Sequence, residues 1–198
     1  MTDVANPERL LFASTTQSFL EKEASLSRLR ELHAAGTSFE ADWWRRAAEL
    51  GWTSLLVPED LGGGSVSGDG VADLALVAEL AGKTVAPGPL HPVSTVLAGL
   101  VEAPENHENT IESLVSGEVV ASWAVYEPGR PWSPLDAAVT ATRTETGFAS
   151  RVSRIASRRA RKAQSCWWWR TATVRCASSW CRRTDPACVS SRSGRSTW

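Results

Sequence analysis

Apolar residues recur at helical spacing along most of the N-terminal part of the chain. After Asp69, apolar side chains follow the i, i+3, i+4, i+7 order that places them on one face of a helix. Asp69 itself is suited to cap the free amides of the first turn. The stripe consists of Val71, Leu74, Ala75, Ala78 and Ala81. The same periodicity predicts further helices after Asn6–Pro7 and over residues 39–50, 93–101 and 108–115.

For two of these helices, the apolar pattern also predicts which side chains face a core. The inward side of the first helix is predicted to consist of Leu10, Leu11, Thr15, Ser18 and Phe19. The helix over residues 39–50 carries Trp43, Ala47 and Leu50 in one stripe. Large aromatic side chains are usually buried, so we expect core or domain-interface positions for Trp43, Trp44 and Trp52.

Glycine and proline mark the ends of the helices. Gly51 follows the second predicted helix, and the segment WTSLLVPEDLGGG after it is predicted to be a turn-rich connection. Its triple glycine, Gly62 to Gly64, lacks the strand before it and the helix spacing after it that a dinucleotide-binding fingerprint requires. We therefore interpret it as a turn. The segment PGPLHP at residues 87–92 is predicted to end the helix that begins after Asp69.

The periodicity changes after Gly117. The segment VVASWAVY at residues 119–126 is rich in β-branched and aromatic residues and is closed by a Glu-Pro-Gly loop. These features predict a strand followed by a loop, and AAVTATR at residues 137–143 predicts a second strand. The chain thus passes from a helical region into the beginning of a β region.

The net charge reverses near residue 150. Residues 1–150 contain 21 acidic and 9 basic side chains, a net charge of −12, whereas residues 151–198 contain 1 acidic and 12 basic side chains, a net charge of +11. All four cysteines and half of the ten tryptophans also lie in residues 151–198. This composition predicts a disordered basic tail.

The chain shows neither a membrane span nor a secretory signal in its sequence. No apolar run approaches the roughly 18 residues that a transmembrane helix needs. The N-terminal MTDVANPERLLF lacks the basic and apolar regions of a signal peptide. A cytoplasmic location is therefore predicted.

No catalytic or metal-binding residue can be assigned from motifs. The three histidines, His33, His91 and His107, have no carboxylate or cysteine at an interpretable spacing. The cysteines form no CxxC pair, and their spacing matches no common zinc module. We assign no catalytic residue and no metal ligand.

Several motifs in order resemble the flavin-dependent acyl-CoA dehydrogenases. An early helix with paired tryptophans precedes ELGWTSLLVPEDLGGG, then a DLALVAELAG helix, then APGPLHPVST. Trp123 to Pro128 and Asp136 resemble the family's strand and loop that open its middle β domain, and the resemblance covers about residues 6–148. It implies a mainly α fold with three parts: an N-terminal helical bundle domain (1–117), the incomplete start of a middle β domain (118–150) and the basic tail (151–198).

The resemblance implies an FAD enzyme that removes two hydrogens across the α,β bond of an acyl-CoA thioester, within a homo- or hetero-oligomer. The segment after residue 122 would contact the flavin through Trp123, Val125 and Tyr126, and Ser133 is a candidate substrate contact. Tyr126 departs from the threonine common in the family, and the loop GRPWSPLD at residues 129–136 is longer than usual. The family's glutamate base lies in a C-terminal helical domain that we do not find here. We therefore expect an inactive fragment that does not retain FAD.

The stretch SCWWWR at residues 165–170 indicates a shifted reading frame. Tryptophan is encoded only by TGG and cysteine only by TGT or TGC. Read from the third base of each codon, Cys166 to Trp169 becomes Leu-Val-Val without any choice, and the flanking codons permit Leu before it and Ala after it. Two neighbouring stretches can be re-read as family-like sequence as well. We expect the frame to slip between about Phe148 and Arg151, which would make residues 151–198 an out-of-frame translation.

Non-catalytic functions form the alternative. A basic tail with aromatic side chains could neutralise phosphates and stack on bases of single-stranded nucleic acid, or could bind an anionic membrane. The helical domain could also be a partner subunit. Nucleic-acid binding is the less favoured interpretation, because an out-of-frame translation explains the same composition.

Overall fold

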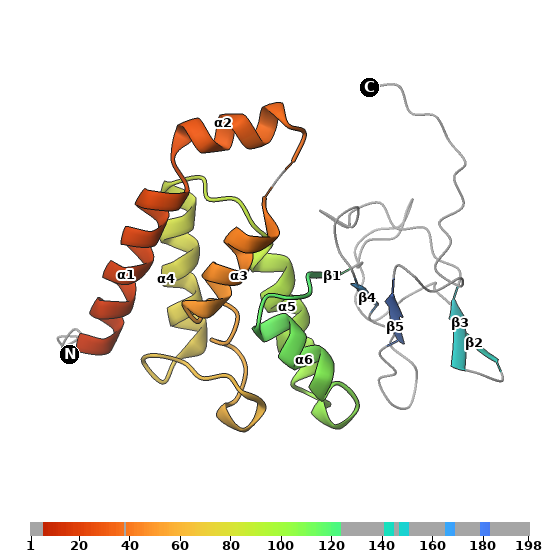
Figure 1. Cartoon of the computed structure of the whole chain (residues 1–198). Helices are drawn as coiled ribbons and strands as arrows, with labels where there is room; N and C mark the ends of the chain where they lie inside the picture. The colour runs from red at the N-terminus through yellow and green to blue at the C-terminus, as the bar shows by residue number, and fades with distance from the viewer. Residues whose placement is uncertain are drawn as a thin grey trace, which may run out of the picture. The chain divides into compact units, whose positions relative to one another are not determined.

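The computed structural model describes residues 6–37 and 39–123, followed by four short strands at residues 141–144, 147–150, 165–168 and 179–182. The chain divides into two compact units, residues 1–120 and residues 121–198. The first unit is helical and the second contains the strands (Figure 1). The prediction of a mainly α fold is confirmed.

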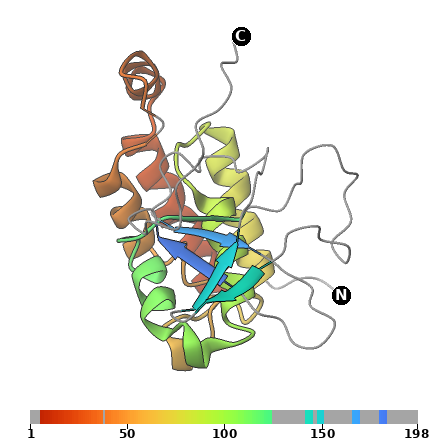
Figure 2. The same cartoon turned by 90° about the vertical axis from the view of Figure 1, so that its right-hand side faces the viewer.

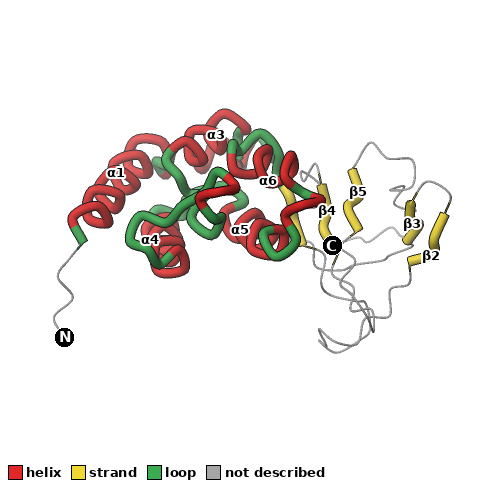
Figure 3. Tube along the Cα trace, turned by 90° about the horizontal axis from the view of Figure 1, so that it is seen from below, coloured by secondary structure: helices red, strands yellow, loops and turns green. Residues whose placement is uncertain are grey.

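The described residues of the first unit form six α-helices, drawn in red in the tube view and joined by loops drawn in green (Figure 3). Two 3₁₀ turns, η1 (Glu59–Leu61) and η2 (Pro104–Asn106), connect some of them. The helices are α1 (Pro7–Glu23), α2 (Leu26–Ala34), α3 (Ala41–Glu49), α4 (Gly70–Lys83), α5 (Leu90–Leu100) and α6 (Glu108–Val115). In the part of the chain that the structure describes, no helix is both long and apolar enough to cross a bilayer.

Side-chain caps begin three of these helices. Asn6 Oδ1 accepts a hydrogen bond from the Glu8 amide at 3.0 Å, and Pro7 occupies the first helical position. Asp69 Oδ1 accepts from the Ala72 amide at 3.0 Å, as predicted for α4. Ser25 Oγ caps α2, a helix that the apolar pattern did not predict. Each cap satisfies an amide that the helix itself leaves without a partner.

The predicted inward face of α1 is wrong for four of its five residues, because Thr15 and Ser18 are exposed as well as the two leucines. Leu10 is 58% exposed and Leu11 is 69% exposed, whereas Thr16 and Leu20 are buried. Helix α1 lies beside α4 (Figure 1), and the Trp52 indole Nε1 donates to Thr16 Oγ1 at 3.3 Å. These tertiary contacts set the rotation of α1, and local periodicity contains no information about them.

The two tryptophans of α3 and Trp52 after it lie in the core, as predicted. Trp43, Trp44 and Trp52 are each no more than 4% exposed. Phe19 of α1 joins them, with its ring centroid 5.7 Å from that of Trp43 and 5.6 Å from that of Trp52. Offset and edge contacts of this kind add to the free energy gained from burying the rings.

The segment between α4 and α5 passes close over the tryptophans. A Cβ built on Gly88 would lie only 2.8 Å from Trp43 Cζ3, and the residue has φ +124°. Helix α5 begins at Leu90, earlier than predicted, because Pro92 falls in the first turn, where its missing amide costs nothing. The break between α4 and α5 therefore covers residues 84–89, three residues earlier than the predicted 87–92.

The triple glycine lies in a turn, as predicted. Gly62 ends η1 with φ +80°, a left-handed conformation that glycine adopts without strain. A Cβ on Gly63 would lie 2.1 Å from the carbonyl oxygen of Val57, so the chain folds back tightly on itself here.

The second unit begins with β1 (Ala121–Trp123). β2 (Ala141–Thr144) and β3 (Gly147–Ser150) form an antiparallel pair (Figure 2). A separate three-stranded sheet has the order β1-β4-β5, with β4 (Ser165–Trp168) parallel to β1 and β5 (Ser179–Arg182) antiparallel to β4. The predicted strands at 119–126 and 137–143 overlap β1 and β2, and their remainders beyond residue 123 and before residue 141 lie outside the described residues.

Candidate functional site

Only the start of the predicted cofactor segment lies within the described residues. Trp123 is the last residue of β1, and its Cα is the ladder partner of that of Trp167. Val125, Tyr126 and Ser133 lie outside the described part of the chain. The structure therefore places one of the four candidate residues on a strand and does not test the other three.

The other two residues of β1, Ala121 and Ser122, are buried, and Ser122 already has an interaction partner. Among the described buried side chains, the polar atoms without a hydrogen-bond partner are Nε1 of Trp43 and of Trp44, both on α3.

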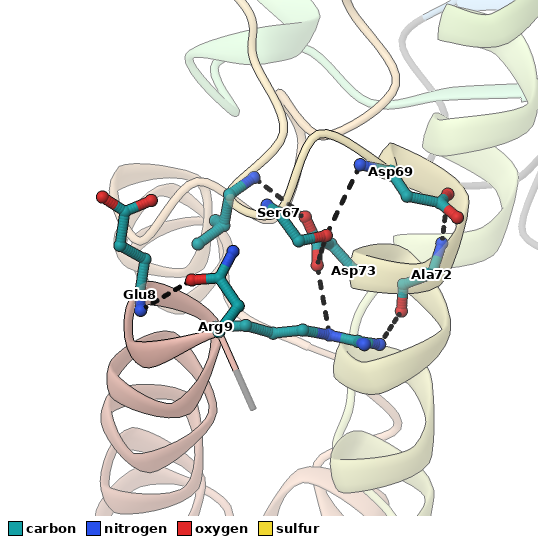
Figure 4. Close-up of polar contacts among 8 residues, drawn as sticks. Glu8, Arg9, Ser67, Asp69, Ala72 and Asp73 are labelled. Carbon is teal, nitrogen blue, oxygen red and sulfur yellow. Dashed lines mark hydrogen bonds and ion pairs between the residues drawn. The ribbon is translucent and has the colours of Figure 1, made fainter. Parts of the chain in front are cut away.

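Asp73 of α4 is a buried carboxylate with several polar partners (Figure 4). Its Oδ2 accepts from the backbone amides of Val66 and Ser67, both at 2.8 Å, and its Oδ1 accepts from Ser67 Oγ at 2.8 Å. Arg9 of α1 approaches the same carboxylate, with Nε 3.3 Å from Oδ1, and donates from Nη2 to the Ala72 carbonyl at 3.0 Å.

This arrangement indicates a structural role for Asp73. The carboxylate is fully buried, and both of its oxygens accept from donors that the fold holds in place. A buried charge is tolerated when it is paired and hydrogen-bonded in this way. Sequence reasoning missed this residue, because an acidic side chain in the first turn of a helix is common for a different reason, the helix dipole.

A small polar pocket of about 240 Å³ lies where α1, α2 and α3 meet. Its charged lining is already paired: Arg46 Nη1 lies 2.8 Å from Glu23 Oε1, and Arg28 donates to Glu40. The hydrogen bond from Arg46 lowers the pKa of Glu23. Because these cations already have carboxylate partners, the pocket has little positive charge left for an anionic ligand.

The histidines form no catalytic constellation. His33 and His91 are exposed, and His107 is half-buried at the start of α6, where burial lowers its pKa. Within the described ranges, no three His, Cys, Asp or Glu side chains gather as metal ligands would. No described residue is thus placed as a catalyst or a metal ligand.

The comparison with protein families decides the classification. A model described as "Acyl-CoA dehydrogenase, N-terminal domain" matches residues 6–118, more than half of the chain. The chain belongs to the acyl-CoA dehydrogenase family. The match covers helices α1 to α6, from the first capped turn to the segment just before β1.

A curated relative shares part of this acyl-CoA dehydrogenase sequence. Acyl-CoA dehydrogenase IpdE2 of Mycolicibacterium smegmatis is 30% identical over 122 residues, which are 61% of this chain and 37% of the relative. The chain therefore spans well under half of the relative's length in this match.

Solved structures agree on the fold. PigA with FAD and proline superposes with a TM-score of 0.75 at 18% identity. The match covers 94% of this chain and 50% of PigA. The ChsE4-ChsE5 complex of Mycobacterium tuberculosis superposes with a TM-score of 0.71 at 18% identity, covering 85% of this chain and 44% of the matched one. At these identities the likeness shows a shared fold alone.

Proposed function

We propose that this chain supplies the N-terminal helical domain and the opening of the middle β domain of an FAD-dependent acyl-CoA dehydrogenase. The parent enzyme would remove two hydrogens across the α,β bond of an acyl-CoA thioester. The observation that carries the proposal is the family match over residues 6–118, which spans all six helices. This proposal includes domain boundaries after residues 117 and 150 and a cytoplasmic location.

The residues proposed to hold FAD follow β1. Trp123 ends that strand, and Val125 and Tyr126 come directly after it. In this assignment they contact the pyrimidine edge and the face of the flavin, and a tyrosine hydroxyl at 126 can donate a hydrogen bond as a threonine would. Ser133 is assigned to the substrate. When bound, FAD supplies an acceptor for the hydride that leaves the β carbon.

We further propose that the 198-residue chain is an inactive fragment, with residues 151–198 translated out of frame. The reversal from −12 to +11 in net charge, together with the change in cysteine and tryptophan usage, supports a shift in frame near residue 150. Tight cofactor binding needs many preorganised contacts made at once. The described residues contribute the end of one strand to such a site.

Flavin retention tests the inactivity of the printed chain. We expect the purified 198-residue protein to carry far less than one FAD per chain and to leave an artificial electron acceptor unreduced when acyl-CoA is added. Stoichiometric flavin or turnover in this chain would contradict the fragment proposal.

A protein expressed with the frame restored after residue 148 tests the assignment of function. We expect it to be yellow and to reduce the acceptor with an acyl-CoA. Tyr126→Phe should weaken FAD binding, and Ser133→Ala should raise KM more than it lowers kcat. Glu127→Gln, beside the proposed contacts, is the matched control and should change neither value. A soluble restored protein without flavin would overturn the enzyme assignment.

The parent is proposed to act as a homo- or hetero-oligomer. The structural neighbours include ChsE4-ChsE5 of Mycobacterium tuberculosis, which is a complex of two proteins. A helical partner subunit without activity of its own is the alternative for this chain. Co-purification with a second, active acyl-CoA dehydrogenase chain would favour that alternative.

A further inference from the structure

Two of the four cysteines are direct partners in the ladder between β4 and β5. Cys166 is the second residue of β4, Cys181 is the third residue of β5, and their Cα atoms are paired across this antiparallel ladder. Cys176 and Cys188 lie outside the described residues. The register therefore singles out one of the six pairs that four cysteines can make.

Direct partners in an antiparallel ladder have the backbone spacing that a disulfide needs. Such partners have Cα atoms about 5.5 Å apart at hydrogen-bonded positions and about 4.5 Å apart at the others. Both values lie within the range of about 4.4–6.8 Å that disulfides span between Cα atoms. Residues directly opposite each other also belong to one face of the sheet. The register thus places Cys166 and Cys181 at a Cα spacing that a disulfide can bridge, whichever kind of position the pair occupies.

Chain length alone would favour a different pair. Closing a loop in an unfolded chain becomes less favourable as the loop grows longer. Cys166 and Cys181 are 15 positions apart in the sequence, whereas Cys176 and Cys181 are only 5 apart. With the usual dependence of loop closure on length, an unfolded chain favours the shorter of these two loops by about fivefold. A Cys166–Cys181 disulfide as the main product would therefore report the ladder rather than proximity along the chain.

We propose that Cys166 and Cys181 form a redox-sensitive disulfide that joins β5 to β4, the strand that lies between β1 and β5. The reaction is thiol–disulfide exchange with a small disulfide such as oxidised glutathione. One cysteine thiolate attacks the oxidant and releases one glutathione thiol, and the second thiolate then attacks the mixed disulfide and releases another. The two protein sulfurs are oxidised to one S–S bond, and the oxidant is reduced to two thiols that take up the two protons from the cysteines.

The proposal concerns the 198-residue polypeptide as printed and does not rest on the proposed enzyme function. It depends on the residues present at positions 166 and 181, whatever reading frame produced them. A reducing compartment keeps such thiols free, so the disulfide forms there only when an oxidant accumulates. Once formed, the bond restricts the unfolded chain and makes β5 harder to separate from β4.

Disulfide mapping of the purified 198-residue protein tests the pairing. The protein is equilibrated with reduced and oxidised glutathione, its remaining thiols are alkylated, and it is digested with trypsin and chymotrypsin for mass spectrometry. The two enzymes place each cysteine on its own peptide, because cleavage sites separate successive cysteines at Arg175, Trp180 and Arg182. We expect roughly tenfold more Cys166–Cys181 than Cys176–Cys181 product in native buffer, against the preference of an unfolded chain for the shorter loop.

Oxidation in concentrated urea is the matched control for chain length. The ladder is lost there, so the Cys176–Cys181 product should exceed the Cys166–Cys181 product. Two variants in native buffer test the assignment further. Cys176→Ser should leave the Cys166–Cys181 link unchanged, whereas Cys181→Ser should leave Cys166 mainly as a free thiol under the same mild oxidation.

Three results would overturn the proposal. The first is a native protein whose main product is Cys176–Cys181, as in urea, or that shows no preferred pair. The second is a disulfide between two chains as the main product. The third is a native protein that forms no disulfide under conditions that oxidise the urea sample. Family membership, which rests on residues 6–118, would be unaffected by any of them.

Discussion

Arg9 of α1 and Asp73 of α4 form an ion pair, with Nε 3.3 Å from Oδ1, between residues far apart in the sequence. The carboxylate is fully buried, whereas the arginine side chain is 36% exposed. The pair joins the first turns of two helices, and Asp73 also holds the loop before α4 through Val66 and Ser67 (Figure 4). One side chain thus fixes three segments relative to one another.

Asp73→Asn should destabilise the helical unit. An asparagine keeps a single acceptor oxygen, so in either orientation its NH2 group would face a donor, either the amides of Val66 and Ser67 or Arg9 Nε. We expect the free energy of unfolding to fall by about 2–4 kcal/mol, measured by urea denaturation with tryptophan fluorescence.

Arg9→Met should cost less, about 1–3 kcal/mol, because Asp73 retains its loop donors. Arg45→Met is the matched control. Arg45 is half-exposed and pairs with Asp42 on the surface of α3, so its loss should change the unfolding free energy by less than about 1 kcal/mol. An Asp73→Asn variant as stable as the parent chain would show that the loop contacts do not contribute to stability.

Gly88→Ala should destabilise the protein because both space and backbone conformation exclude a side chain. The new Cβ would lie 2.8 Å from Trp43 Cζ3 and 3.3 Å from Trp44 Cε3, at φ +124°. We expect a loss of about 2–4 kcal/mol in thermal or urea unfolding. Gly82→Ala is the control with the opposite sign: Gly82 lies in α4 with nothing within 4 Å, so alanine should add about 0.5–1 kcal/mol. Equal effects of the two substitutions would contradict this account.

The helices and their caps could largely be predicted from the sequence, because caps and helical periodicity are local signals. The stripe predicted for α4 is not its buried face, since Asp73 and Val77 are the buried residues and Val71 is 71% exposed. Asp69 caps α4 and Trp43 is buried, as their positions in the pattern indicate. The rotation of α1 could not be predicted. Leu10 and Leu11 are adjacent, and the contacts that turn both outward come from Asp73 and Trp52, more than thirty residues away.

The candidate site was accessible to sequence reasoning only through the family resemblance. No periodicity distinguishes Trp123 from any other aromatic residue at the end of a strand. The role of Asp73 was equally hidden, because the donors that surround it come from a glycine-rich loop with no regular pattern. Contacts made by loop amides depend on the folded path of the chain.

Val85→Gly should stabilise the protein. Val85 follows the C-cap of α4 with φ +53°, and the Ala86 amide donates to the Ala81 carbonyl at 2.8 Å, as in helix C-termini where glycine is usual. A β-branched residue in the left-handed region costs roughly 1–2 kcal/mol, part of which glycine loses again to the entropy of the unfolded chain. We expect a net gain of up to about 1 kcal/mol in urea unfolding. Val85→Ala is the control: it removes the branch but keeps a Cβ, so it should raise the free energy of unfolding by less. A fall in the free energy of unfolding on Val85→Gly would show that the valine side chain makes a stabilising contact.

Stability should also fall in mildly acidic solution through His107. Burial lowers the pKa of this imidazole, although the charge of Glu105 opposes the shift. Below the ordinary histidine pKa of 6.5, the unfolded chain therefore takes up a proton more readily than the folded one. The contribution of His107 is fully present above that pH and is lost progressively as the pH falls through 6.5 and then through the lower folded pKa.

His107→Gln removes this proton uptake, so between pH 7.5 and pH 5.5 its unfolding free energy should decline less than that of the parent chain. His33→Gln, at an exposed position on α2, is the control and should follow the parent curve. Identical slopes for His107→Gln and the parent would refute the assignment.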